Sequence, residues 1–305
     1  MLNLNKFNWS NLKDYTNLYN QINSLNSTAR SYDQNSIKKI LNLPGADPES
    51  NLNIAYWNNN PIGFNYMQHE NYINRIVFTG GVIKQYQRRG VGKLLLTRAL
   101  EELSSYSGYV CHVQAEKQET GLIELLANLE FHPVNEYLKM ILKKPELVKM
   151  NNTSDYIIET FQQGEDEKLL TDIQNDVFRG SWGFAPNTID EISARMNLDR
   201  AEPKGVLFVR KVQHQSKSVV AYCWTLRSQN PHGHVGWISM VGCTPQNRGK
   251  GVGRIATVAG INYLAEQGVD EIELEVAARN KPAIELYRNL GFKFISDTLW
   301  FEKTL

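Results

Sequence analysis

A short glycine-rich segment is the part of the sequence best suited to binding an anion. Its residues are Arg248, Gly249, Lys250, Gly251, Val252, Gly253 and Arg254. Glycines at a turn let backbone N–H groups converge on one ligand, and a following helix N-terminus favours a phosphate. The segment lacks the GK[ST] ending of a P-loop and is shorter than the dinucleotide fingerprint. Taken alone, it is also consistent with a simple turn that begins a helix.

The same segment occurs a second time, earlier in the chain. The earlier copy consists of Gln87, Arg88, Arg89, Gly90, Val91, Gly92 and Lys93. A second pair of matching segments, Asn128–Phe131 and Asn289–Phe292, has the same separation (248 − 87 = 289 − 128 = 161). Because two unrelated segments would rarely share both patterns at one separation, the chain contains an internal duplication.

The elements around each copy predict two domains of one architecture, a mixed α/β sheet with helices. We expect domains at 1–146 and 153–305, joined by a polar, proline-containing stretch. In the first half, Arg75–Val82 is the strand before the loop. Apolar periodicity in the second half predicts helices at 167–178, 190–196, 251–267 and 281–290, and strands at 155–160, 206–210, 218–226, 234–243, 271–276 and within 292–301.

Composition bounds the class of protein without naming its chemistry. The 305 residues are 42% hydrophobic with a net charge of +1, so we expect two globular domains and no nucleic-acid partner. The sequence has no apolar run long enough for a membrane span and no secretion signal, which favours the cytoplasm. Three cysteines outside any CxxC pair predict neither a disulfide framework nor a metal site. A monomer and a homodimer both remain open.

The glycine segment and the residues after it resemble the GNAT (GCN5-related N-acetyltransferase) family. In that family a bulged strand is followed by [RQ]-x-x-G-x-[GA] at a helix start, as in Val241–Gly253. The next motif of the family resembles Leu274–Val276 together with Asn280, Ala283, Leu286, Tyr287, Gly291 and Phe292. The resemblance covers about 235–301 well and about 75–142 moderately. It implies two tandem GNAT domains.

The resemblance also implies acetyl-CoA as the co-substrate. Backbone groups of Val241 and Cys243 would pair with the pantetheine arm as an added strand, which a splayed sheet edge permits. The loop from Arg248 to Arg254 would hold the pyrophosphate, and Asn280 would contact the pantetheine. In the first half, the matching positions are Val82, Gln87, Arg88, Arg89, Gly90, Val91 and Gly92.

Transfer of an acetyl group to an amine requires an oxyanion donor and an acid for the departing thiolate. Tyr287 matches the family position whose phenol is that acid, although a tyrosine three residues after Ile284 on one helix face is also typical of a core. A backbone N–H near Cys243 is the expected oxyanion donor. The thiol of Cys243 is then expected to pack without reacting.

The general base and the acceptor site leave weaker signals. Glu273 and Glu275 share one face of a predicted strand with Glu271, and each could be a base or simply a solvated residue. His232 and His234 are further candidates, and a water relay would leave no signal. In the loop after the first helix, Trp182 and Phe184 are expected to shape the acceptor pocket, or to pack beneath the loop.

The first half lacks residues that the second retains. At the 161-residue separation, Leu126 replaces Tyr287 and Glu119 replaces Asn280. Leucine cannot donate a proton, so we expect this domain to be degenerate: it either binds acetyl-CoA without catalysis or keeps its glycines for turn geometry alone.

Four functions remain open for the whole chain. Acetylation of a primary amine on a small molecule is favoured over acetylation of a protein amine. The tandem layout also resembles that of mycothiol synthase, which acetylates a cysteinyl amine, but Trp237 stands where that enzyme's acidic base is expected. A non-catalytic acetyl-CoA-binding regulatory module is the alternative from another class.

Overall fold

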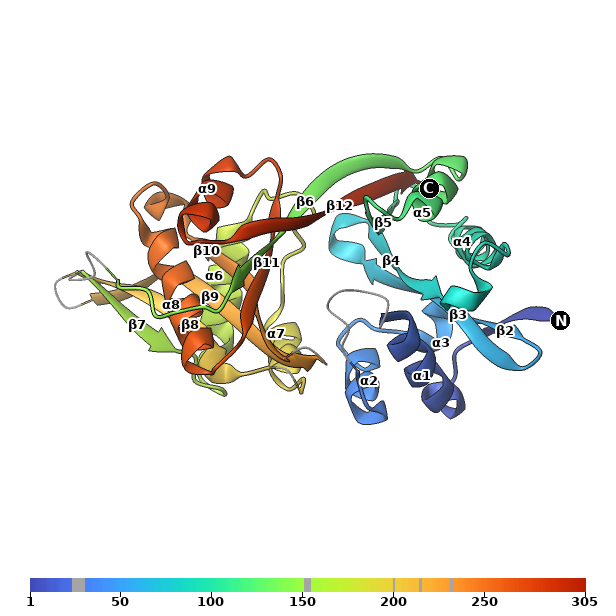
Figure 1. Ribbon diagram of the computed structural model, residues 1–305, viewed down its shortest axis with the longest axis horizontal. Coiled ribbons are helices and arrows are strands. Elements are labelled where there is room, and N and C mark those ends of the chain that lie inside the picture. Colours follow the sequence, from blue (N-terminus) through green and yellow to red (C-terminus); the bar gives the residue numbers. More distant parts are fainter. Residues whose placement is uncertain (24–30, 151–154, 200, 214–215, 231–232) are drawn as a thin grey trace. The chain divides into compact units, whose positions relative to one another are not determined.

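The computed structural model describes residues 1–23, 31–150, 155–199, 201–213, 216–230 and 233–305. The chain divides into two compact units (Figure 1). Unit 1 contains Met1–Tyr137 and Ser296–Leu305, and unit 2 contains Leu138–Ile295. Within the described residues, no helix is both long and apolar enough to cross a membrane.

Unit 1 is a sheet with helices on both faces. Its helical elements are η1 (Trp9–Asn11), α1 (Leu12–Asn23), α2 (Gln34–Leu41), α3 (Pro48–Asn51), η2 (Asn71–Ile73), η3 (Lys84–Tyr86), α4 (Val91–Glu102) and α5 (Thr120–Asn128). Its strands follow the order β1 (Leu2–Lys6), β2 (Leu52–Trp57), β3 (Asn60–Glu70), β4 (Arg75–Val82) and β5 (Val110–Glu116). All these pairs are antiparallel except the parallel pair β4–β5.

Unit 2 repeats this plan. Its helical elements are α6 (Glu167–Phe178), α7 (Ile189–Met196), η4 (Pro203–Gly205), η5 (Pro245–Asn247), α8 (Val252–Glu266) and α9 (Lys281–Asn289). Its strands follow the order β7 (Tyr156–Thr160), β8 (Val206–Gln213), β9 (Ser216–Asn230), β10 (Gly233–Cys243) and β11 (Glu271–Ala277). Here β10–β11 is the parallel pair, as β4–β5 is in unit 1. The elements predicted for this half are confirmed, with β8, β9 and the last strand longer than expected.

Two long strands contribute to the unit other than the one their sequence position suggests. They are β6 (His132–Lys143), after α5, and β12 (Lys293–Thr304), after α9. Residues 298–304 of β12 pair with β5 in unit 1, and residues 138–143 of β6 belong to unit 2, where β6 neighbours β11. The grouping therefore differs from the expected domains 1–146 and 153–305. The physical reason is hydrogen bonding, because β12 pairs with β5 of the first half of the sequence and β6 neighbours β11 of the second half.

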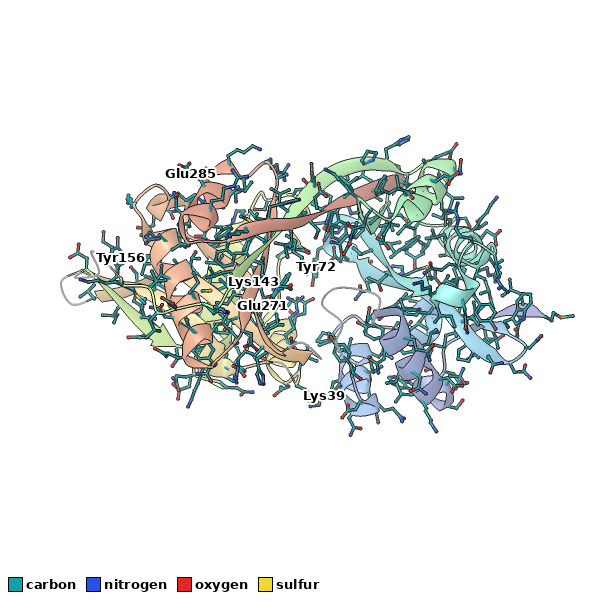
Figure 2. The ribbon with its side chains drawn as sticks, viewed as in Figure 1. Lys39, Tyr72, Lys143, Tyr156, Glu271 and Glu285 are labelled. Carbon is teal, nitrogen blue, oxygen red and sulfur yellow. The ribbon has the colours of Figure 1, made fainter. Side chains whose placement is uncertain are left out.

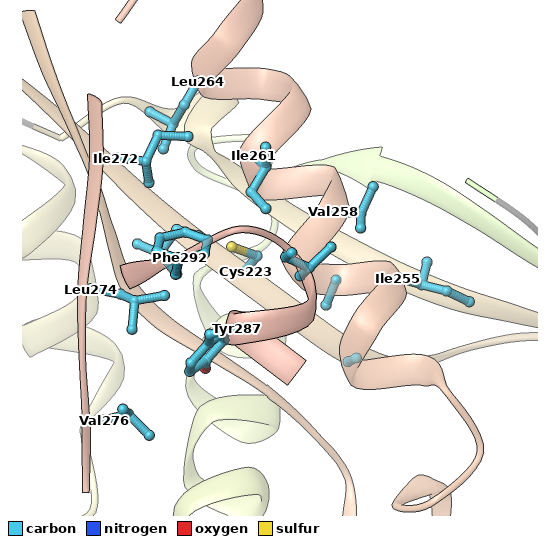
Figure 3. Close-up of a cluster of buried hydrophobic side chains, with 14 of the residues drawn as sticks. Cys223, Ile255, Val258, Ile261, Leu264, Ile272, Leu274, Val276, Tyr287 and Phe292 are labelled. Atoms are coloured by element: carbon cyan, nitrogen blue, oxygen red, sulfur yellow. The ribbon is translucent and has the colours of Figure 1, made fainter. Parts of the chain in front are cut away.

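The two faces of the sheet in unit 2 are covered by two separate apolar layers. One cluster includes α8, α9 and residues of β9–β11 such as Cys223, Ile238 and Leu274. Figure 3 shows this cluster, with Ile261 and Leu264 of α8 on the side of Phe292 and Ile272. The other cluster packs α6 and α7 against the opposite face, which carries Tyr222 and Trp224 of β9. We call that second face the acceptor face, and it is defined by Tyr222, Trp224, Trp237 and Glu273.

Candidate active site

The strand β10 opens away from β11 just before the glycine loop. The parallel pairing of β10 with β11 ends at Ile238 and Leu274. On its other side, β10 pairs with β9 through Cys243, with a register shift between Ile238 and Met240. A bulge bends its strand, and here it leaves the β11-facing backbone of residues 239–243 outside the ladder. This confirms the expectation of a bulged strand before the loop, and it leaves backbone groups at Val241 and Cys243 for an amide-containing ligand.

The glycine loop of unit 2 provides an open cradle at the N-terminus of α8. Gly249 and Gly251 have φ values of 75° and 80°, in the left-handed region that favours glycine. A Cβ built at Gly249, Gly251 or Gly253 would meet nothing within 4 Å. The first N–H groups of α8, beginning at Val252, have no partner within a helix and carry its positive dipole end. These residues fit a pyrophosphate, with Lys250 and Arg254 exposed beside them.

The side chain of Arg248, expected from the sequence to bind the pyrophosphate, also contacts α6. Its Nη2 donates a hydrogen bond of 2.9 Å to the carbonyl oxygen of Val177, in the last turn of α6. The same turn approaches the cofactor strand closely, because a Cβ added at Gly242 would lie 2.4 Å from Cγ1 of Val177. The loop, the bulged strand and the end of α6 are therefore in direct contact.

Tyr287 lies at the edge of the apolar cluster in Figure 3, beside Phe292. Its ring centroid is 5.9 Å from that of Phe292, and the side chain is 7% exposed. Burial raises the pKa of the phenol, with a smaller contribution from Cys223, so the group holds its proton at neutral pH. Tyr287 thus packs in the core, as the simpler interpretation predicts, and also remains a neutral O–H donor. On the opposite face of α9, Glu285 projects outward (Figure 2).

Asn280 and Cys243 have identifiable local roles. The side chain of Asn280 accepts a hydrogen bond of 3.3 Å from the N–H of Ala283 and so caps α9. Burial raises the pKa of the Cys243 thiol, while Arg248 and the backbone at Gly253 lower it to a smaller extent. The thiol of Cys243 is therefore protonated at neutral pH.

The candidate bases occupy different environments. Glu271 is half-buried at the start of β11, labelled in Figure 2, and Glu275 is exposed. Glu273 is 4% exposed and forms an ion pair of 3.1 Å with Lys139 of β6. The ammonium of Lys139 lies 5.8 Å from the ring centroid of Trp237, the register partner of Glu273. His234 is exposed, and His232 lies outside the described residues.

The acceptor-side loop between α6 and α7 carries Trp182 and Phe184, both half-buried. Its far end is held by Asn175 of α6, whose amide exchanges hydrogen bonds of 2.9 and 2.8 Å with the backbone of Asn187. The layer formed by α6 and β9 contains buried polar atoms that the sequence did not predict: Gln174 Oε1, Tyr222 Oη and Trp224 Nε1. Alternation of Tyr222 and Trp224 along β9 was the available signal, because residues two apart share a strand face.

The loop of unit 1 has similar turns but different contacts. Gly90 begins α4 with φ 81°, as Gly251 begins α8, while Arg88 adopts φ 59° where unit 2 has Gly249. The Gln87 side chain donates a hydrogen bond of 3.0 Å to the carbonyl of Val82, and the guanidinium of Arg89 lies over the ring of Tyr86. The β3–β4 pairing continues through Val82 without a register shift. Val91 is buried, and a Cβ added at Gly92 would make an ordinary van der Waals contact of 3.6 Å with Leu125. Leu126 is fully buried and, as a leucine, supplies no proton donor in place of Tyr287.

Comparison with known proteins shows a likeness between part of unit 2 and one protein family. The model of the family described as "Acetyltransferase (GNAT) family" matches residues 168–292. A mycothiol acetyltransferase of Arthrobacter sp. (strain FB24) is 31% identical over 176 residues, which cover 55% of this chain and 53% of that protein. One of Pseudarthrobacter chlorophenolicus is 28% identical over 211 residues, covering 68% and 64%. The chain thus spans about half to two thirds of the length of these relatives.

Solved structures extend the likeness to the whole fold. A GCN5-related N-acetyltransferase from Sphaerobacter thermophilus has a TM-score of 0.73 at 17% identity, covering 99% of this chain and 95% of that one. A tandem GNAT protein from the clavulanic acid biosynthesis pathway has a TM-score of 0.75 at 12% identity, covering 100% and 98%. Residues 168–292 of unit 2 are therefore similar to the GNAT acetyltransferase family, and the whole chain has the fold of a tandem GNAT protein.

Proposed function

We propose that the protein transfers an acetyl group from acetyl-CoA to a primary amine of a small molecule, and that unit 2 performs the reaction. The observation that carries the proposal is the juxtaposition in unit 2 of an opened, bulged strand with a glycine cradle at the start of α8. The first holds an amide-containing arm and the second an anion. The similarity of residues 168–292 to the GNAT family supports acetyl-CoA as the ligand that carries both groups.

In the proposed mechanism the neutral amine nitrogen attacks the thioester carbon. A backbone N–H near Cys243 stabilises the oxyanion, the C–S bond breaks, and Tyr287 gives its proton to the leaving thiolate. The raised pKa of Tyr287 supports this role in one respect, because the phenol keeps its proton at neutral and moderately alkaline pH and so can donate it. A proton leaves the amine nitrogen for water or for a base that we do not assign.

The test is thiol release from acetyl-CoA with a panel of small amines, by wild-type protein and Tyr287→Phe. The expected result is a fall in kcat of roughly tenfold or more, equivalent to about 1.4 kcal/mol of transition-state stabilisation. The dissociation constant of acetyl-CoA should change little, since phenylalanine keeps the ring. Tyr263→Phe is the matched control: it removes a phenol of the same unit whose hydroxyl donates a hydrogen bond of 2.8 Å to Glu202 and has no part in the proposed reaction.

The pH dependence sharpens the same test. Because burial raises the pKa of Tyr287, loss of its proton should not reduce the wild-type rate up to about pH 10, the ordinary tyrosine value. Equal rates for wild type and Tyr287→Phe would remove the acid role. No turnover with any amine, combined with measurable acetyl-CoA binding, would favour the non-catalytic regulatory module.

The relatives named mycothiol acetyltransferase favour one second candidate, acetylation of a cysteinyl amine. Trp237 occupies the position at which we expected an acidic base for that reaction, and its register partner Glu273 is paired with Lys139. A cysteinyl amine included in the panel decides between this candidate and a simpler amine by the ratio of their kcat/KM values.

A further inference from the structure

The acceptor-side loop of unit 2 is fixed at both of its ends by contacts that differ in origin. We define this loop as residues 179–187, from the residue after α6 to the residue before the α7 cap. At its far end, the side chain of Asn175 in α6 forms hydrogen bonds with the backbone of Asn187. Arg195 of α7 donates a hydrogen bond of 2.8 Å to the Asn187 side chain. Helix residues of the acceptor side supply both contacts.

The near end is held by the cofactor loop instead. The last carbonyl groups of a helix have no partner inside it. In α6, the carbonyl of Phe178 accepts from Ser181 at 2.9 Å, and the carbonyl of Val177 accepts from the guanidinium of Arg248 at 2.9 Å. A cation at a helix C-terminus is also favoured by the helix dipole. The chain then leaves the helix at Arg179 and turns at Gly180, which has φ 75°.

A second contact joins the same turn of α6 to the cofactor strand. Val177 lies so close to Gly242 that any side chain there would overlap it, at 2.4 Å. Valine has little freedom to move aside, because branching at Cβ restricts χ1. The position of the last turn of α6 is therefore determined by two residues of the cofactor site, Arg248 and Gly242. The loop that carries Trp182 and Phe184 begins directly after this turn.

We propose that Arg248 is a positioning residue, which fixes the acceptor-side loop through the carbonyl of Val177 and so links the cofactor loop to acceptor binding. The inference rests on the proposed function of unit 2. A guanidinium has five N–H donors in a planar fork, so Arg248 can keep this bond while its exposed edge faces a phosphate. Occupation of the cradle then restrains the guanidinium, and with it the start of the loop.

Hydrogen exchange in full-length protein tests the proposal without requiring turnover. In Arg248→Met, the amides of residues 179–187 should exchange at least tenfold faster than in wild type, while those of α8 keep their protection. Lys250→Met removes an exposed cation from the same loop and serves as the matched variant. It should leave exchange at 179–187 unchanged and weaken acetyl-CoA binding, because its charge faces the cradle.

Kinetics separate positioning from helix capping alone. Arg248→Met should raise the acceptor KM about tenfold in addition to weakening acetyl-CoA binding, whereas Lys250→Met should weaken acetyl-CoA binding and change the acceptor KM less than threefold. Gly242→Ala, which displaces Val177, should reproduce the faster exchange. Unchanged exchange at 179–187 in Arg248→Met overturns the proposal, as does faster exchange with an unchanged acceptor KM. If wild-type protein turns over no amine, the proposed function fails, and the exchange data still decide whether Arg248 fixes the loop.

Discussion

At the scale of single residues, the acceptor face of unit 2 contains an ion pair that is nearly removed from water. The side chains of Lys139 and Glu273 are 9% and 5% exposed. Desolvation of two charges is costly, so the attraction between them largely offsets that cost without adding much stability. The pair therefore matters most when one partner is lost. Glu273 also has this structural role whether or not it takes part in proton transfer.

Replacement of one partner should be far more harmful than replacement of both. Lys139→Met leaves the Glu273 carboxylate buried without its cation, and we expect a loss of about 3–5 kcal/mol in the free energy of unfolding. The double variant Lys139→Met with Glu273→Leu should recover most of this loss, because both side chains are then apolar. Denaturant unfolding of the four proteins in this cycle measures the coupling. Losses that simply add would show that the two charges do not interact.

Residue types and their spacing predicted the backbone features of the candidate cofactor site, but not the contacts of its side chains. The glycine pattern predicted the loop at the start of α8, and the structure confirms both the turn and the bulged strand before it. Arg248 was read only as a phosphate ligand, because its contact with Val177 joins residues 71 positions apart. A contact of that separation depends on tertiary packing, and periodicity within one segment does not report it.

At the scale of elements, the packing of α8 against the sheet requires a glycine at position 260. The helix is buried along most of its length, and Gly260 lies in its middle. A Cβ at Gly260 would lie 2.4 Å from Sγ of Cys223 and 3.3 Å from Cγ2 of Thr225, both on β9. Close approach of helix and sheet thus outweighs the usual preference for other residues within a helix.

Gly260→Ala should destabilise the protein although alanine is the better helix former. The propensity gain is about 1 kcal/mol, whereas overpacking costs about 1–3 kcal/mol, so we expect a small net loss. Cys223→Ala should relieve the overlap and restore stability in the double variant. Gly253→Ala is the control in the same helix, since a Cβ there meets nothing within 4 Å. Thermal unfolding checks all four proteins, and a stabilised Gly260→Ala would contradict the close approach.

The elements themselves were largely predictable because their apolar periodicity is strong. The predicted helix 167–178 and the predicted strand 75–82 coincide with α6 and β4. The last strand was predicted only within 292–301, and β12 in fact runs from Lys293 to Thr304. Its charged positions Glu302 and Lys303 obscure the pattern. In the structure Glu302 pairs with His112 at 2.8 Å, and Lys303 donates a hydrogen bond of 2.8 Å to Glu130. Both partners are distant in the sequence.

At the scale of the whole molecule, the duplication was visible in the sequence and the exchange of terminal strands was not. The repeated motifs give the number of domains, since each copy needs its own sheet. Strand pairing, however, is decided by hydrogen bonds between segments far apart in the chain, which the residue pattern of one segment does not specify. The expected boundaries placed residues 296–305 with unit 2, whereas they pack in unit 1.

Loss of the last ten residues should therefore damage unit 1, although they follow unit 2 in the sequence. Thr298–Thr304 pair with β5, and Phe301 is 3% exposed in the cluster that contains Cys111 and Leu126. Protein ending at Ile295 should show at least tenfold faster amide exchange in β5, because a buried strand becomes an open edge. Protection in α8 should persist. The outcome that contradicts this assignment is faster exchange confined to unit 2.

A point substitution makes the same argument without shortening the chain. Phe301→Ala removes a large side chain from a packed core and should cost about 3–5 kcal/mol. Phe294 lies on the same strand but is 54% exposed, so Phe294→Ala should change stability by no more than about 0.5 kcal/mol. Because the two phenylalanines differ only in what surrounds them, faster exchange of β5 in the first variant and not in the second would locate the end of β12 in unit 1.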